Sequence, residues 1–156
     1  MRVLGVQCTN RFAFLAVLDG TTLVMTGPPR LEPAQSTDQD HALWDTLSTI
    51  GGALDEIAPY RVGLLLPGTG ENTKHPHGFW APRVELETFL RMAAAQRGIV
   101  VDRLSRAAVL SKLGLPLRGR FEDLVRPVVP KTGPYWQDGR LSAAAAAALA
   151  LAEEDS

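Results

Sequence analysis

The stretch RVLGVQCTNRFAFLAVLDGTTLVM, residues 2–25, decides the fold of this chain. It contains three β-rich runs, at residues 2–8, 12–18 and 21–25. The polar break Thr9-Asn10-Arg11 separates the first two runs at a spacing typical of a hairpin. Asp19-Gly20, a strong turn dipeptide, separates the second run from the third. The sequence therefore predicts that the fold opens with three antiparallel strands.

Beyond this meander, helical and extended patterns alternate. We expect a helix through residue 57 that Ser36 or Thr37 caps, then a buried strand at 60–66 and irregular chain at 67–81. A helix from Pro82 to 98, a strand at 99–101 and a helix from Ser105 to 114 are expected next. The last expected elements are a helical turn at 121–125 and a terminal helix that Asp138 could cap. This order predicts an α/β fold with a five-stranded mixed sheet, three antiparallel strands followed by parallel ones, flanked by helices.

The composition is that of an ordinary globular protein. The 156 residues are 46% hydrophobic and 21% charged, with a formal net charge of -1, which predicts a single domain over residues 1–156. The longest apolar stretch, residues 141–152, is too short to span a bilayer, and the N-terminus has no export-signal pattern. Cys8 is the single cysteine. It cannot form an internal disulfide framework, which favours the reducing cytoplasm, and no membrane partner is expected.

This order of elements resembles the ribonuclease H-like superfamily and, within it, the RuvC-like Holliday-junction resolvases and related short bacterial domains. The resemblance covers nearly the whole chain, and the segments that carry it are residues 3–7, 61–66, 98–101 with 105–113, and 143–152. In active members, carboxylates of the first strand, the fourth strand and the terminal helix hold two divalent ions. The ions clamp the attacking and leaving oxygens of a phosphodiester.

The positions that match those carboxylates carry no acid in this chain. Gln7 stands in the first strand, Leu66 or Pro67 at the fourth, and alanines at 143–148 in the terminal helix. Without carboxylates nothing offsets the mutual repulsion of the metal ions, so the departures imply a non-catalytic domain with no metal and no cofactor. The alternative is a divergent nuclease or resolvase that binds Mg²⁺ or Mn²⁺ through relocated acids, namely Glu71 with Asp19 or Asp138.

Two segments are candidates for binding DNA, RNA or a protein partner. The loop at 67–80 follows the central strand at its carboxyl end, where α/β sheets tend to bind ligands, and its glycines and aromatic residues suit an anion or a base. Between Arg103 and Arg140, eight lysines or arginines stand against three acids, which predicts salt-dependent affinity for phosphate. The candidate binding residues are Gln7, Lys74, His75, His77, Trp80, Arg103, Arg106, Lys112, Arg118 and Arg120.

Other chemistries remain as alternatives. His75 and His77, together with His41 or Cys8, are conceivable zinc ligands, although a strong zinc motif has paired ligands at both ends. Cys8 is expected to be a packed, inert thiol rather than a nucleophile. A purely structural subunit is a further alternative, because the small-residue face of the helix at 143–152 could pack on the sheet or on a second copy in a homodimer.

Overall fold

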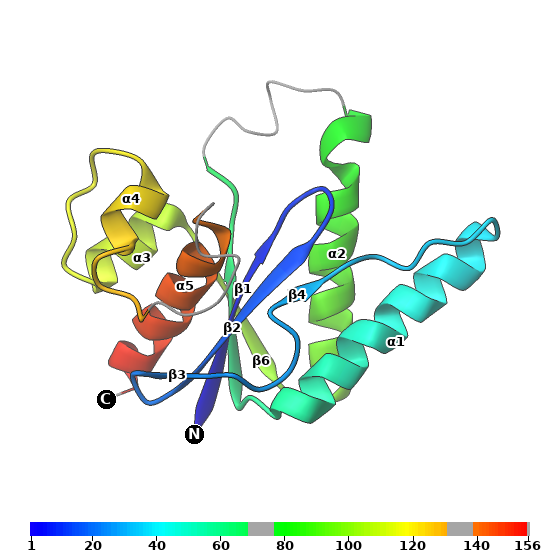
Figure 1. The fold of residues 1–156 in the computed structure, drawn as a ribbon, viewed down its shortest axis with the longest axis horizontal. Helices are drawn as coiled ribbons and strands as arrows, with labels where there is room; N and C mark the ends of the chain where they lie inside the picture. The colour runs from blue at the N-terminus through cyan, green and yellow to red at the C-terminus, as the bar shows by residue number, and fades with distance from the viewer. Residues whose placement is uncertain (69–76, 131–138, 156) are drawn as a thin grey trace.

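The computed structural model describes residues 1–68, 77–130 and 139–155. Its centre is a mixed β-sheet with helices on both sides (Figure 1). The strands are β1 (Arg2–Cys8), β2 (Ala13–Asp19), β3 (Thr22–Val24), β4 (Arg30–Leu31), β5 (Arg61–Leu65) and β6 (Val100–Leu104). The helices are α1 (Gln39–Ile57), α2 (His77–Gln96), α3 (Arg106–Lys112), α4 (Phe121–Val125) and α5 (Arg140–Glu154).

The strand order β3-β2-β1-β5-β6 confirms the expected topology. Strands β1, β2 and β3 form an antiparallel meander, and β1, β5 and β6 run parallel. The sequence analysis missed β4, a two-residue strand that pairs with β2 opposite Ala13 and Phe14. A strand this short carries no alternating pattern, so only its tertiary pairing reveals it.

Strand alternation divides the interior into two cores. On β1, Leu4, Val6 and Cys8 belong to the core under α1 and α2. Val3, Gly5 and Gln7, which alternate with these residues, face the core that α3, α4 and α5 cover. Figure 1 shows these two groups of helices on opposite sides of the sheet. Because successive side chains of a strand point to opposite faces, the nearly continuous apolar runs of β1 and β5 follow from burial on both sides.

Helix α5 lies unusually close to the sheet. A Cβ atom added to Gly5 would come within 1.8 Å of the carbonyl oxygen of Ala144, and one added to Gly63 within 3.1 Å of that of Ala147. Gly5 and Gly63 are direct partners in the β1–β5 ladder, so together they form a flat platform for the alanine-rich helix. Although α5 is buried, no helix of the described ranges is long and apolar enough to cross a membrane.

Several predicted element ends were wrong. Asp38, not Ser36 or Thr37, caps α1, and its carboxylate accepts hydrogen bonds from the two backbone amides at Asp40 and His41. Helix α2 begins at residue 77, so that Pro82 lies inside it instead of in its first turn. Strand β6 runs to residue 104 rather than 101. The predicted cap at residue 105 and the helical turn at 121–125 are confirmed.

Candidate functional site at the carboxyl end of β1

Gln7 lies at the carboxyl end of β1, in the middle of the sheet. It is 3% exposed, and its neighbour in the parallel ladder is Leu65, the last residue of β5. Its side chain points to the face that α5 covers. Ligands of open α/β sheets commonly bind beside the carboxyl ends of parallel strands, so the groups that surround Gln7 form the first candidate site.

The amide of Gln7 links the first turns of two helices. In the orientation that satisfies both partners, its nitrogen donates to the carbonyl oxygen of Arg140 at 3.1 Å. Its oxygen accepts from Nη2 of Arg106 at 3.2 Å. Amide orientation is assigned from the hydrogen-bond network, and this orientation satisfies both neighbouring groups. A guanidinium cation therefore contacts the side chain of Gln7.

A buried carboxylate, Glu122, holds this guanidinium from the other side. Nη1 of Arg106 donates to Oε1 of Glu122 at 3.1 Å, and the guanidinium lies 5.2 Å from the ring centre of Phe121. Nε of Arg120 lies 3.4 Å from Oε2 of the same carboxylate. Burial alone would raise the pKa of Glu122, but its own backbone N–H and the nearby guanidinium of Arg106 outweigh this effect and lower the pKa.

A third arginine, Arg126, directly follows α4 and lies near Gly139. Gly139, directly before α5, has φ of +81°, and a Cβ atom added there would lie 2.7 Å from Cβ of Glu122 and 3.5 Å from Nη2 of Arg126. Nε of Arg126 is buried and has no hydrogen-bond partner among the described residues. Gly139 provides no side-chain cap for α5 within these residues, so the positive end of the helix dipole adds to the local charge.

We call Arg106, Arg120 and Arg126 the arginine cluster. Within the described residues, Arg106 and Arg120 contact the carboxylate of Glu122, and the guanidinium of Arg126 lies close to Gly139 beside it, so arginines outnumber acids near Gln7. Planar guanidinium groups bind phosphate and carboxylate oxygens through paired hydrogen bonds. The chemistry available here is therefore the binding of an anion.

The described residues do not fit a two-metal centre. Within residues 1–68, 77–130 and 139–155, no group of three histidine, cysteine or acidic side chains could hold a metal ion. The oxygen of Gln7 already accepts from Arg106, and a divalent cation placed beside it would be repelled by that guanidinium.

The relocated acids proposed from the sequence do not meet Gln7 within the described chain. Asp19 pairs with Arg2 at the other end of the β1–β2 ladder, about 17 Å from Gln7 at the usual rise per residue. It binds the terminal amine of Met1 at 3.1 Å. Glu71 and Asp138 lie outside the described residues.

The predicted basic residues separate into different surfaces. Lys112 is at the far end of α3, where its Nζ lies 2.8 Å from Glu154. Arg103 acts electrostatically on Glu87 of α2, on the opposite face of the sheet from the arginine cluster. Arg118 is exposed between α3 and α4. Only Arg106 and Arg120 of the five come together, joined through Glu122.

The loop residues are only partly described. Trp80 is partly exposed in the first turn of α2, and His77 begins that helix, although its side chain lies outside the description. Lys74 and His75 lie outside the described residues.

The remaining nucleophile and zinc candidates stand apart. Cys8 is 5% exposed, which confirms the packed thiol, and burial raises its pKa far above the ordinary value. His41 lies 3.4 Å from Asp45 on the exposed face of α1. The described part of the chain thus gives no zinc site around Cys8 and His41.

The sequence analysis missed Glu122, Arg126 and the backbone of Arg140 as parts of the site. The spacing of Glu122 and Arg126, four residues apart on one helical turn, was a usable signal. The proximity of these residues to Gln7 could not be predicted from the sequence, because it depends on how α4 and α5 pack.

Solved structures with the same fold exist for proteins of very different sequence. Thermus thermophilus RuvC in complex with a Holliday junction substrate superposes with a TM-score of 0.73 at 15% identity, over 99% of this chain and 94% of that one. The structure of Thermus thermophilus RuvC matches with a TM-score of 0.72 at 16% identity, over 99% and 95%. The yeast mitochondrial Holliday junction resolvase Ydc2 matches with a TM-score of 0.57 at 10% identity, over 97% and 80%.

No protein-family model matches the chain, and no curated protein matches its sequence. At 10–16% identity, the structural matches establish the fold. The chain has the ribonuclease H-like fold in its RuvC-like form, as the order of its elements predicted.

Proposed function

We propose that this protein binds the phosphodiester backbone of a nucleic acid at the arginine cluster, and that it does so without metal ions and without cleaving the strand. The observation that carries the proposal is the contact between Gln7 and Arg106. On this fold, the place beside the first strand is where bound cations meet a phosphate in active resolvases. Here a protein cation lies at that place.

The cluster is suited to phosphate by charge and by burial. Among the described residues, one carboxylate, Glu122, lies beside the three arginines. The side chain of Arg106 is only 19% exposed, and a charge in such surroundings is screened less by salt than a charge in open solvent. Arg120, at 67% exposure, is available to the solvent side. A phosphate would thus meet one fixed and one adaptable arginine.

A branched DNA is the first ligand to test. The Thermus thermophilus RuvC structure holds a Holliday junction substrate, and this chain covers nearly the full length of that protein. A four-way junction, a duplex and a single strand of equal length distinguish branched DNA from the other backbone forms. The same three forms made of RNA extend the comparison.

The experiment measures binding of these probes by fluorescence anisotropy in EDTA over a range of salt concentrations. Affinity is expected to fall steeply with salt, because neutralised phosphates release their counterions. Arg120→Gln and Arg126→Gln should each weaken binding by about five- to tenfold and reduce the salt slope by about 1. Arg91→Gln is the matched control, since Arg91 is exposed on α2, away from the cluster. Equal effects of all three changes would contradict the assignment.

The alternatives make different predictions in the same samples. A divergent nuclease acting through Glu71 or Asp138 would cleave a probe when Mg²⁺ or Mn²⁺ is added, and Glu71→Gln would abolish the cleavage. A purely structural homodimer would bind none of the probes at low salt and would show twice the chain mass in light scattering. We assign the binding function to the cytoplasm, the compartment that the single cysteine favours.

A further inference from the structure

Two arginines meet on one aromatic ring beside the turn between β1 and β2. The guanidinium carbon of Arg30 lies 4.1 Å from the ring centre of Phe12, and that of Arg11 lies 5.3 Å from the same centre. Phe12 in turn packs edge to face on Phe14, with 6.0 Å between the two ring centres. The ring therefore brings together two cations from separate parts of the chain, and we call Arg11 and Arg30 the hairpin arginines.

Local hydrogen bonds fix the shape of this turn. The hydroxyl oxygen of Thr9 accepts from the backbone N–H of Arg11 at 3.2 Å and from that of Phe12 at 3.1 Å. The backbone N–H of Thr9 donates to the carbonyl oxygen of Phe12 at 2.8 Å. Arg30 reaches the ring from β4, which pairs with β2. A guanidinium group stacked on a ring is ordered before a ligand arrives, and its N–H groups can bind phosphate oxygens in pairs.

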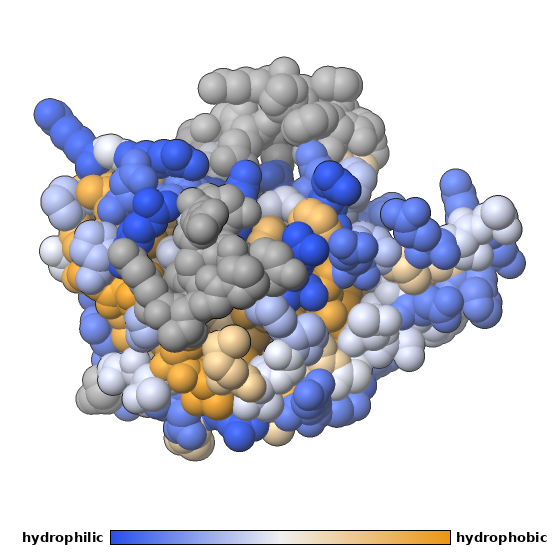
Figure 2. Space-filling view, viewed as in Figure 1, coloured by the Kyte–Doolittle hydropathy of each residue, from blue (hydrophilic) through white to orange (hydrophobic). Residues whose placement is uncertain are grey.

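The hairpin arginines and the arginine cluster border the same face of the sheet. Phe14 is the ladder partner of Gln7 on one side and of Arg30 on the other, and residues directly opposite each other in adjacent strands point to the same face. Two strand spacings, about 10 Å, separate Gln7 from Arg30. In Figure 2, strongly hydrophilic residues lie over α4 and again over the region where β2 and β4 meet. One ligand could therefore reach both groups of arginines.

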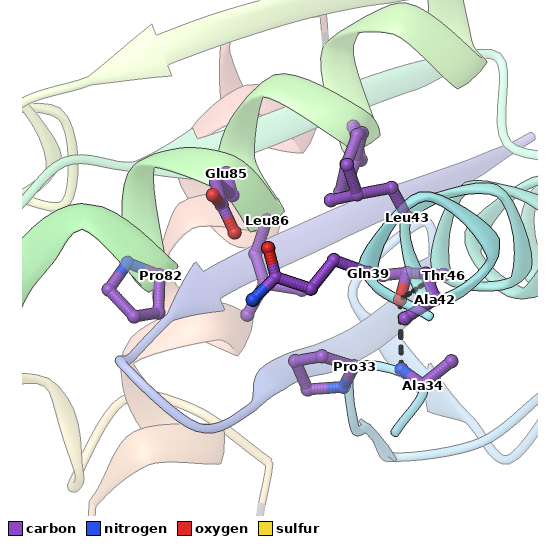
Figure 3. A pocket seen from close by; sticks show the side chains of 10 residues that line it. Pro33, Ala34, Gln39, Ala42, Leu43, Thr46, Pro82, Glu85 and Leu86 are labelled. Carbon is purple, nitrogen blue, oxygen red and sulfur yellow. Dashed lines mark hydrogen bonds between the residues drawn. The ribbon is translucent and has the colours of Figure 1, made fainter. Parts of the chain in front are cut away.

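The pocket on the opposite face of the sheet is lined by an acid instead of arginines. It has a volume of about 330 Å³ and lies between α1 and α2, where Figure 3 shows Gln39 and Glu85 on its walls. Glu85 is the charged residue of its lining. A carboxylate in this position repels a phosphate, so the face that carries the hairpin arginines is the better surface for a nucleic acid strand.

We propose that the hairpin arginines form a second phosphate-binding site for the nucleic acid strand that the arginine cluster holds, an inference that rests on the function proposed above. Phosphates recur about every 3.4 Å along the axis of a duplex strand, so the roughly 10 Å between Gln7 and Arg30 corresponds to about three nucleotides. Glu32, which is 63% exposed, lies 3.8 Å from Arg30. A phosphate can displace this carboxylate readily, because solvent-accessible ion pairs are weak.

The test measures binding of a four-way DNA junction, a duplex and a single strand by fluorescence anisotropy in EDTA over a range of salt concentrations. Arg11→Gln and Arg30→Gln should each weaken binding by about three- to tenfold and reduce the salt slope by about 1, because each removes a phosphate contact. Phe12→Leu should weaken binding by about threefold without changing the salt slope, because it removes the ring that orders the two charges and keeps the charges. Arg91→Gln, on the exposed surface of α2, is the matched control and should bind like the unaltered protein.

Combination with Arg120→Gln separates this inference from the proposed function. The losses of affinity from Arg11→Gln and Arg120→Gln should multiply in the double variant, because well-separated contacts contribute independently. Loss with Arg120→Gln, together with unaltered binding by both Arg11→Gln and Arg30→Gln, would overturn the second site and leave the arginine cluster in place. Loss with the two hairpin variants but not with Arg120→Gln would overturn the arginine cluster instead. A protein that binds none of the probes would overturn the proposed function and this inference together.

Discussion

Gln7 connects three elements through one amide. It donates to the backbone at the start of α5, accepts from Arg106 at the start of α3, and is itself part of β1. At 3% exposure, water cannot replace either partner easily. The amide thus fixes a guanidinium group at the end of the sheet where we expect a phosphate to bind.

Gln7→Leu is expected to destabilise the protein. The substitution leaves a buried carbonyl oxygen and a guanidinium N–H without their partner, which costs about 1–3 kcal/mol of unfolding free energy. Urea denaturation followed by circular dichroism measures the change. Gln96→Leu, at the exposed end of α2, is the control and should change stability by no more than about 0.5 kcal/mol. Equal losses in the two variants would show that the amide makes no structural link.

Glu122 should make stability depend on acidic pH. Its pKa is lowered in the folded protein from an ordinary value of 4.5. A lowered pKa stabilises the fold above the pKa of the unfolded chain, and this contribution disappears as the pH falls through the folded value. Glu122→Gln should therefore be less stable than the unaltered protein at pH 6, and the difference should shrink below pH 4.5. A difference that stays constant between pH 3 and 6 would contradict the role of the charge.

Part of the site could be predicted from these residues and part could not. The place of Gln7 near the end of the first strand was predictable, because strand position alone locates it. The pairing of Gln7 with Arg106 spans 99 positions of the chain and depends on the approach of α3. Lys112 carries the same charge as Arg106, yet it bonds Glu154 at the far end of α3. A count of lysines and arginines in the sequence cannot distinguish the surroundings of Arg106 from those of Lys112.

Helix α5 owes its position to two glycines. Gly5 and Gly63 remove the side chains that would otherwise hold the helix away from the sheet. The sequence predicted a buried helix, since its apolar stretch is long and nearly uncharged. It could not predict the close approach, because the spacing between helix and sheet arises from residues about 80 to 140 positions apart in the chain. The start of α2 was missed for a similar reason. Local sequence preference places Pro82 in the first turn of a helix, whereas tertiary packing keeps the chain helical on both sides of Pro82.

Gly5→Ala should prevent normal docking of α5. The added methyl would lie 1.8 Å from the carbonyl oxygen of Ala144, which is backbone and cannot rotate away. The expected loss of unfolding free energy is more than about 3 kcal/mol, at or beyond the upper range for overpacked cores, with a smaller loss for Gly63→Ala. Thermal denaturation measures both.

Gly52→Ala is the control for these two substitutions. Gly52 lies in α1, and no described atom would be within 4 Å of its added Cβ. The change should stabilise the protein by up to about 1 kcal/mol, because alanine is the better helix former. If Gly5→Ala were tolerated as well as Gly52→Ala, the close approach of α5 would be wrong.

The end of the molecule opposite the arginine cluster is held by an ion network. Arg61 of β5 binds Asp102 of β6 at 2.6 Å and Asp155, just beyond α5, at 2.8 Å. Tyr60 donates a hydrogen bond to Asp155, and that bond raises the pKa of the tyrosine. The network joins the sheet to the last helix at one end of the molecule, and the arginine cluster lies at the other end.

Arg61→Leu is expected to lower the unfolding free energy by about 1 kcal/mol, the upper end for solvent-accessible ion pairs. The loss should diminish in high salt, since salt screens the pairs in the unaltered protein. Arg118→Leu removes an exposed arginine between α3 and α4 and should have no comparable effect. Salt-independent losses of equal size in both variants would argue against the network.

The whole-chain topology was the most predictable feature, because the alternation of strands and helices fixes it locally. The distribution of charge over the folded surface could not be predicted from the sequence. The basic segment of the sequence separates into the arginine cluster, a paired Lys112, and Arg103 on the other face of the sheet. Strand alternation and helix packing decide these placements.

Binding of a four-way DNA junction in EDTA, compared with binding and strand cleavage in Mg²⁺ and in Mn²⁺, tests most directly whether arginines take the place of metal ions. We predict equal or slightly weaker binding when the metals are present, because divalent ions compete for the phosphates, and no cleaved strand. Binding that requires a metal ion, or cleavage that EDTA abolishes, would contradict this prediction and place a metal centre at the end of β1.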